Sequence, residues 1–133
     1  MAVARSLVHL TQLKGVVRIA MSRSDDLKCV NLFCEKVGGP CVCRLERAIC
    51  REHLVATVEE LDLSGNGLTH LPPSIAKLTQ LRLLDLSSNS IASLDRDLLR
   101  PLINLQTLVL SDNPLAVEEV ETARRVTRAT VVF

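Results

Sequence analysis

The sequence is poor in aromatic residues: it has no tryptophan, no tyrosine and two phenylalanines among 133 residues. Hydrophobic residues make up 47% of the chain, so they are mainly aliphatic, and we expect a folded core packed largely by leucine, isoleucine and valine. The formal net charge is only +1. With neither aromatic platforms for stacked bases nor a strongly basic surface, we expect no nucleic-acid partner.

Long apolar runs are also missing. Lys14 and Arg18 interrupt the longest N-terminal apolar stretch, which falls short of the roughly 18 residues that a membrane-spanning helix needs. The longest uninterrupted run before residue 24 is short and bounded by His9, Thr11 and Gln12, which is unlike the apolar core of a secretory signal. We therefore expect no membrane partner.

Motifs for catalysis are absent from the sequence as well. There is no glycine-rich phosphate loop and no paired metal-ligand motif. The three histidines (His9, His53 and His70) are scattered, and none lies beside a serine or cysteine nucleophile with an orienting acid. The sequence predicts a protein that is not an enzyme, with no catalytic residue, no metal and no cofactor.

The sequence does contain one pattern three times. The copies are Val58-x-x-Leu61-x-Leu63-x-x-Asn66-x-Leu68, Leu81-x-x-Leu84-x-Leu86-x-x-Asn89-x-Ile91 and Leu105-x-x-Leu108-x-Leu110-x-x-Asn113-x-Leu115. The asparagines are 23 and then 24 residues apart (66 to 89, 89 to 113), within the period of about 20–29 residues known for such repeats. Within each core, inward and outward residues alternate as in a short strand.

The pattern resembles the leucine-rich-repeat family in its short intracellular-type form, over roughly residues 58–115. The resemblance implies an α/β fold: a short solenoid of three strand-bearing repeats with a helical N-terminal cap and a helix-plus-strand C-terminal cap. It also implies that Asn66, Asn89 and Asn113 form a structural ladder, in which side-chain amides bond to backbone groups in the turn after each strand.

Stacked repeats would align their outward strand positions into rows on the concave face. These rows are Glu60, Leu83 and Thr107; Asp62, Asp85 and Val109; and Ser64, Ser87 and Ser111. Exposed apolar groups beside charge are typical of contact sites, so Glu60, Asp62, Leu83, Asp85, Thr107 and Val109 are predicted to bind a partner with a basic and apolar segment. Asp62 and Asp85 are equally open to a scaffold role, in which they satisfy neighbouring backbone groups.

The flanking segments divide the rest of the chain. Residues 1–24 carry four bases and no acid, and form either an ordinary basic leader or extra helix, or a mitochondrial targeting segment with a processing site at Arg18-Ile19-Ala20. Residues 25–57 predict a helical, cysteine-containing cap made of two helices, about 25–37 and 41–56. Residues 116–133 predict a helix over 117–126, in which Glu121 reaches Arg125, and a final strand.

All five cysteines precede the repeats: Cys29, Cys34, Cys41, Cys43 and Cys50. The run Cys41-Val42-Cys43 followed by Cys50 resembles the disulfide-held N-terminal modules of extracellular leucine-rich-repeat proteins, although the cysteine count is odd. A zinc site is a second interpretation, but the Cys-x-Cys spacing is short for one tetrahedral ion. Reduced thiols used as small hydrophobic groups are a third.

Together these features predict a non-enzymatic adaptor or assembly subunit that binds another protein through the concave face. The alternative is a regulatory or accessory subunit of a larger enzyme complex, which the basic leader would place in mitochondria. If the protein is not directed to mitochondria, we expect it in the cytoplasm.

Overall fold

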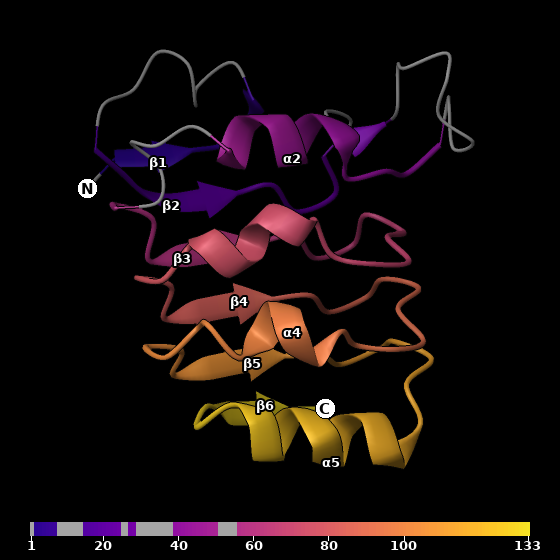
Figure 1. Ribbon diagram of the computed structural model, residues 1–133. Coiled ribbons are helices and arrows are strands. Elements are labelled where there is room, and N and C mark those ends of the chain that lie inside the picture. The colour runs from indigo at the N-terminus through magenta and orange to yellow at the C-terminus, as the bar shows by residue number, and fades with distance from the viewer. Residues whose placement is uncertain (1, 8–14, 25–26, 29–38, 51–55) are drawn as a thin grey trace.

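The computed structural model describes residues 2–7, 15–24, 27–28, 39–50 and 56–133. Its centre is one parallel six-stranded sheet in which the strands follow their order along the chain (Figure 1). The strands are β1 (Ala2–Ala4), β2 (Val16–Ala20), β3 (Glu60–Asp62), β4 (Leu83–Asp85), β5 (Thr107–Val109) and β6 (Thr130–Val132).

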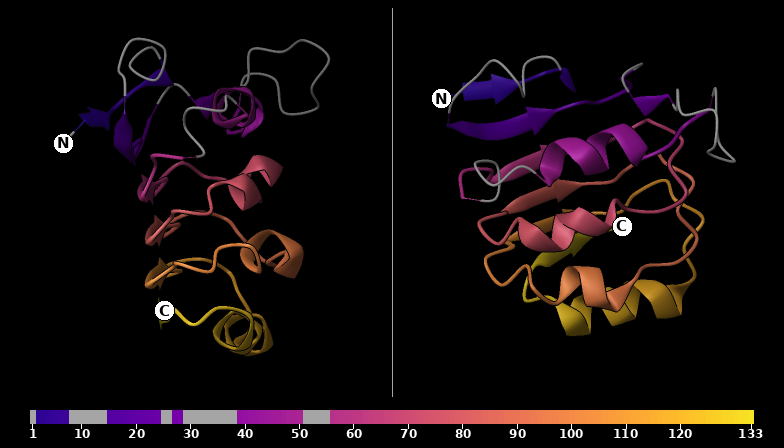
Figure 2. Two further views of the ribbon diagram at one scale, coloured as in Figure 1. Left: turned by 60° about the vertical axis from the view of Figure 1, so that its left-hand side comes forward. Right: turned by 45° about the horizontal axis from the view of Figure 1, so that its top comes forward.

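The helices form a second layer along one side of the sheet (Figure 2). They are α2 (Cys43–Ile49), the 3-10 helix η2 (Pro73–Lys77), α4 (Arg96–Leu99) and α5 (Val117–Val126). The side chains that fill the space between the two layers come from both, as the fully buried Leu61, Leu84 and Leu108 of the strands and Ile75 of η2 illustrate. The aliphatic core predicted from the composition is confirmed.

The three predicted repeat strands are confirmed as β3, β4 and β5. Glu60 aligns with Leu83 and then Thr107, and Asp62 aligns with Asp85 and then Val109, which is the predicted register. Each repeat places one leucine inward between two outward residues, so the strands are held in register by burial of that leucine.

Strand β2 corrects the interpretation of residues 1–24 as a leader that precedes a helical cap. It pairs with β3, and β1 pairs with β2, so the edge of β3 is occupied by a strand where a helical hairpin was expected. The physical reason is that Val16, Ile19 and Met21 are fully buried or nearly so, and they continue the apolar core of the repeats.

Residues 16–24 repeat the local geometry of residues 58–66 at a spacing of 42. The Met21 N–H donates to the carbonyl of Asp62 at 2.9 Å, as the Leu63 N–H donates to the carbonyl of Asp85 at 2.9 Å. Arg23 has a left-handed φ of 50°, and the corresponding positions in the following turns, Gly65, Ser88 and Asp112, have φ values of 68°, 55° and 57°. β2 and its turn are therefore one further repeat unit, separated from the next by a longer connection.

Helix α2 lies within the second predicted helix, and its residues Leu45 and Ile49 are buried as expected. The first predicted helix, about 25–37, lies outside the described residues except for residues 27 and 28. The carboxylate of Glu46 on α2 accepts a hydrogen bond from the Ser74 N–H at 2.8 Å. This bond satisfies a donor at the start of η2 and ties the two helices together.

The C-terminal helix and strand are confirmed as α5 and β6, with β6 paired to β5. Acids lie in the first turn of α5 and arginines in the last, which complements the helix dipole. Glu121 pairs with Arg124, at 2.6 Å between Oε1 and Nη1, and not with the predicted Arg125. Among the described residues, no helix is both long and apolar enough to cross a bilayer.

Candidate interaction surface

The outward side chains of the sheet form two long rows on the side away from the helices, which we call the strand face. Strand pairing aligns the first row as Arg18, Glu60, Leu83, Thr107 and Thr130. It aligns the second row as Ala20, Asp62, Asp85, Val109 and Val132. All six residues predicted from the sequence to contact a partner are therefore neighbours on one surface.

Arg18 changes the charge of this surface. Its Nη1 lies 3.1 Å from Glu60 Oε2, and its Nη2 lies 3.7 Å from Asp62 Oδ2. Arg18 is not among the predicted contact residues, because the sequence pattern does not identify β2 as a strand. Both acids therefore form ion pairs with Arg18 of the same chain.

Asp62 and Asp85 share a local structural role at the ends of their strands. Asp62 Oδ1 accepts hydrogen bonds from the Ser64 N–H at 3.0 Å and from its hydroxyl at 2.7 Å. Asp85 binds Ser87 with the same two distances. Asp85 differs in one respect: no ion pair joins it to any residue that the structure describes. One carboxylate oxygen of Asp85 thus holds the turn that follows the strand. No basic side chain among the described residues compensates the negative charge of Asp85.

Apolar side chains lie beside Asp85 on β4 and β5, while its neighbour on β3 is Asp62. Leu83 precedes Asp85 by two residues on β4, and Val109 aligns with Asp85 on β5. One further apolar residue was not predicted as a contact: Val132, which is 43% exposed in the same row. The predicted final strand was the signal for it, since alternation along this strand places Val132 outward.

The asparagines after the strands bind the backbone of two successive repeats. Asn89 Nδ2 donates to the carbonyls of Leu63 and Leu86, at 3.0 and 2.9 Å, while its Oδ1 accepts from the N–H groups of Asn66 and Leu68, both at 3.0 Å. Asn113 binds the carbonyl of Leu86 and the N–H of Ile91 in the same way, at 2.8 and 3.0 Å. Buried amides of this kind persist because they are fully hydrogen-bonded.

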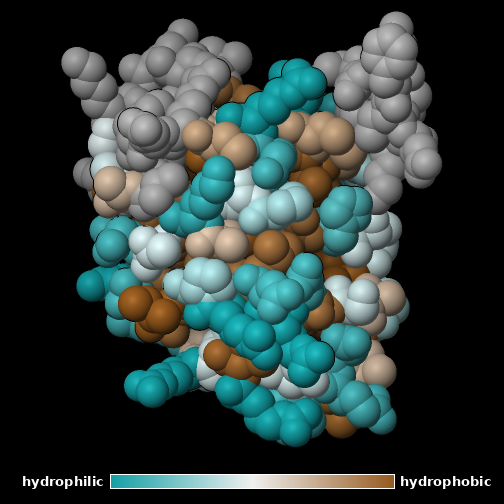
Figure 3. Space-filling model, viewed as in Figure 1, coloured by the Kyte–Doolittle hydropathy of each residue, from teal (hydrophilic) through white to brown (hydrophobic). Residues whose placement is uncertain are grey.

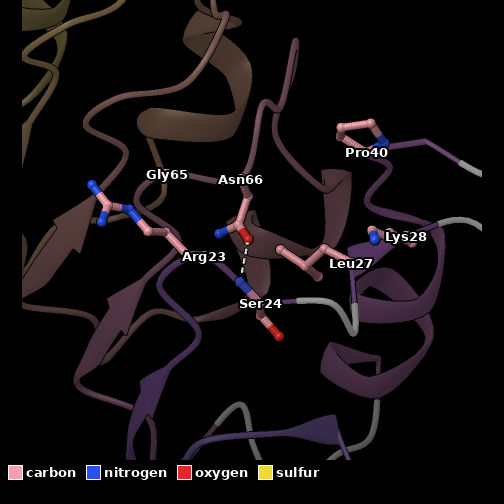
Figure 4. A pocket seen from close by; sticks show the side chains of 7 residues that line it. All are labelled: Arg23, Ser24, Leu27, Lys28, Pro40, Gly65 and Asn66. Carbon is pink, nitrogen blue, oxygen red and sulfur yellow. Dashed lines mark hydrogen bonds between the residues drawn. The ribbon is translucent and has the colours of Figure 1, made fainter.

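The first asparagine reaches back to β2. Asn66 Nδ2 donates to the Met21 carbonyl at 2.8 Å, and its Oδ1 accepts from the Ser24 N–H at 2.7 Å, the bond drawn in Figure 4. Ser24 therefore takes the place that an asparagine takes in each later turn.

Residues 56–115 match the leucine-rich-repeat family, and the strand register and asparagine ladder have the geometry that the repeat pattern implied.

Residues 56–115 of this chain are leucine-rich repeats, and the fold around them is that of a leucine-rich-repeat protein.

The chain is similar to segments of much longer proteins. The sequence is 39% identical to mouse podocan over 61 residues, 45% identical to trophoblast glycoprotein of Macaca fascicularis over 58, and 42% identical to the human geranylgeranyl transferase type-2 subunit alpha over 67. These matches cover 46%, 43% and 50% of this chain, and 10%, 14% and 12% of the three relatives. The similarity thus concerns a small part of each relative.

Solved leucine-rich-repeat structures share the fold over nearly the whole chain. A leucine-rich-repeat protein of Leptospira interrogans matches 95% of this chain with 27% of its own, at a TM-score of 0.67 and 26% identity. Human trophoblast glycoprotein matches 99% of this chain with 60% of its own, at a TM-score of 0.59 and 18% identity. The second likeness shows the fold alone.

The cysteines of this leucine-rich-repeat chain lie away from the strand face. Cys41, Cys43 and Cys50 are buried, half-buried and exposed in that order, and the Sγ atoms of Cys41 and Cys43 are 3.0 Å apart. Cys29 and Cys34 lie outside the described residues. Within the described part of the chain, no group of three or more histidines, cysteines and acids could hold a metal ion.

A cavity of about 180 Å³ lies beside the turn that carries Asn66, and Figure 4 shows its lining side chains. Leu27 and Pro40 form its apolar part, and Arg23 and Lys28 add positive charge. The Asn66 amide already binds backbone groups in the turns that follow β2 and β3, so this polar lining group has a structural role.

Proposed function

We propose that this chain is a non-enzymatic protein-binding module, an adaptor or assembly subunit, whose partner docks on the strand face. The observation that carries the proposal is the set of apolar outward residues around Asp85, a carboxylate without an ion pair among the described residues. Leucine-rich repeats generally bind other proteins, and an outward apolar group beside an uncompensated charge is characteristic of a contact surface.

The chemistry of the strand face favours a partner segment with one basic side chain between apolar ones. Arg18 compensates Glu60 and Asp62, so Asp85 is the acid best suited to a cation from a partner. Leu83 on the same strand, and Val109 and Val132 on the two following strands, would supply the apolar contacts. The contact is therefore proposed to lie toward β4, β5 and β6, displaced from the area around Glu60.

A second candidate is an accessory subunit of a larger enzyme complex. It is supported by the similarity to geranylgeranyl transferase type-2 subunit alpha, which is by name a subunit of an enzyme. In this case the same strand face would bind another subunit. Co-purification with an enzymatic activity that the isolated chain lacks would favour this candidate over an adaptor.

The test is affinity capture from the native cell with three versions of the full chain: wild type, Leu83→Arg/Val109→Arg, and Gln80→Arg/Val117→Arg. The control places the same added charge at exposed positions outside the strands. Circular dichroism must first establish that all three are folded. We expect a discrete set of proteins to be lost with the strand-face variant and retained with the control. Retention of the same proteins by the strand-face variant would show that binding uses another surface.

A further inference from the structure

A second apolar surface lies at the rim of the molecule, where the chain enters β5 and β6. Ile103 is 78% exposed, although large hydrophobic side chains are usually buried. Beside it is a cavity of about 270 Å³. Its lining residues are Arg100, Leu102, Ile103, Val126, Thr127 and Arg128.

The two walls of this rim cavity are held by local hydrogen bonds. On one side, the connection after α4 is fixed by bonds from the Leu102 N–H to the Leu99 carbonyl at 3.1 Å and from the Ile103 N–H to the Pro101 carbonyl at 2.9 Å. On the other, the Thr127 hydroxyl donates to the carbonyl of Ala123 at the end of α5, at 2.9 Å. Leu102 is 3% exposed and belongs to the core, so the cavity has a preformed apolar floor.

The charged part of the lining is entirely positive. Arg100 and Arg128 are the two ionisable residues in it, and no carboxylate takes part. Arg128 forms no ion pair with the residues described here, and the pair between Arg100 Nη1 and Asp97 Oδ1, at 3.3 Å, is solvent-exposed. Such exposed pairs contribute little to stability, so Arg100 can exchange Asp97 for another carboxylate at small cost.

Figure 3 views the side of the molecule on which the helices lie in front of the strands. Hydrophilic side chains dominate it over α4 and α5, with separate hydrophobic groups among them. In Figure 1 the end of α5 and the start of β5 lie at the left of this side. The rim cavity, which is lined by both apolar and arginine side chains, is accessible to a partner there and is separate from the strand face.

We propose that the rim cavity binds an acidic peptide segment of a partner protein, with one apolar side chain entering between Ile103 and Val126 and its flanking carboxylates meeting Arg100 and Arg128. The volume suits this occupant, because cavities for drug-sized ligands are larger, about 300–1,000 Å³. The two guanidinium groups would form ion pairs with carboxylates of the peptide, and Ile103 would pack against its apolar side chain. This site would take an acidic segment, whereas the strand face is proposed to take a basic one.

The test is a titration of the ¹⁵N-labelled full chain, followed by NMR, with the peptide acetyl-Glu-Leu-Glu-amide. Two control peptides separate charge from anchor: acetyl-Lys-Leu-Lys-amide and acetyl-Glu-Ser-Glu-amide. We expect saturable shifts of the amide signals of Leu102, Ile103 and Thr127 with the first peptide, at about millimolar affinity. The control peptides are expected to shift these signals much less.

Matched variants identify the residues responsible. Arg128→Gln removes a charge from the lining, and Arg125→Gln removes an exposed charge of the same helix end that does not line the cavity. We expect Arg128→Gln to weaken binding by roughly threefold or more, and Arg125→Gln to leave it unchanged. Ile103→Ser should also weaken it, since the anchor loses its apolar partner.

Three results would overturn the proposal. They are unmoved signals at Leu102, Ile103 and Thr127, equal shifts with a control peptide, or equal binding by the Arg128 and Arg125 variants. Concentration-dependent broadening of the same signals without peptide, removed by Ile103→Ser, would instead assign the cavity to a second copy of the chain. Peptide binding by Leu83→Arg/Val109→Arg must equal that of wild type, which keeps this result independent of the strand-face proposal.

Discussion

Arg18 of β2 and Glu60 of β3 lie opposite each other in the sheet, with 3.1 Å between Nη1 and Oε2. The two residues are 42 positions apart in the chain, yet they are nearest neighbours in one row of the strand face. A second contact of Arg18, at 3.7 Å from Asp62, brings both acids of β3 under the influence of one cation. The pairing therefore determines which part of the strand face carries uncompensated negative charge.

Removing this cation should change binding more than folding. The side chains of Arg18 and Glu60 are about one-third exposed (31% and 34%), so Arg18→Gln is expected to lower the free energy of unfolding by about 1 kcal/mol or less. The same change frees two carboxylates on the strand face and should increase the affinity for a partner with a basic segment. Urea denaturation and calorimetric titration with a captured partner measure the two effects. Weaker binding together with unchanged stability would argue that Arg18 itself contacts the partner.

Asp85 and Asp62 offer a matched comparison. Each accepts the same two hydrogen bonds from the serine two residues later, and asparagine at either position keeps an oxygen to accept them. Asp85→Asn should weaken partner binding by about fivefold, because it removes the uncompensated charge. Asp62→Asn should have a smaller effect, because Arg18 already compensates that carboxylate. Titration of both variants with one captured partner measures the difference, and a larger loss with Asp62→Asn would contradict the placement of the contact.

The sequence was sufficient to predict β3, β4 and β5 because a leucine, an asparagine and a fixed period agree in all three. It was not sufficient to predict β2. The spacing Val16-x-x-Ile19-x-Met21-x-x-Ser24 equals that of Val58-x-x-Leu61-x-Leu63-x-x-Asn66, but serine replaces the asparagine and the next copy follows 42 residues later. A spacing of 42 lies outside the period of about 20–29 residues of leucine-rich repeats, so the pattern does not predict a repeat strand there. The ion pair of Arg18 depends on that strand and was missed with it.

The placement of β2 can be tested by its buried residue. Ile19 is fully buried, whereas its neighbour Val17 is half-buried. Ile19→Ala should lower the free energy of unfolding by about 2–5 kcal/mol, because it leaves a cavity in the core. Val17→Ala should cost less than about 1 kcal/mol. Chemical denaturation of the full chain measures both. An unchanged stability for Ile19→Ala would support the original interpretation of residues 1–24 as a leader outside the fold.

The asparagine ladder predicts a large effect of one polar side chain. Asn89 is 7% exposed, and Asn89→Leu leaves the N–H groups of Asn66 and Leu68 without their partner. It also removes one of the two side-chain amide donors from each of the carbonyls of Leu63 and Leu86. We expect a loss of about 1–3 kcal/mol in the free energy of unfolding. Asn104 is the control: it is exposed and also donates to a backbone carbonyl, that of Thr79 at 2.9 Å, but water can replace this bond. Equal stability of Asn89→Leu and Asn104→Leu in urea would contradict a structural role of the ladder.

The turn before each asparagine predicts a stabilising substitution. Ser88 has a φ of 55° at the position where Gly65 has a φ of 68°. A residue with a β-carbon is strained in this left-handed conformation by roughly 1 kcal/mol, which glycine avoids. Ser88→Gly should therefore raise the free energy of unfolding, by less than this amount because glycine also gains entropy in the unfolded chain. Ser90, exposed and without a positive φ, supplies the control, and Ser90→Gly should lower it. Thermal and urea unfolding of the two variants should thus differ in sign, and a destabilised Ser88→Gly would mean that the Ser88 hydroxyl, 3.4 Å from Asp112 Oδ2, contributes more than the relief of strain.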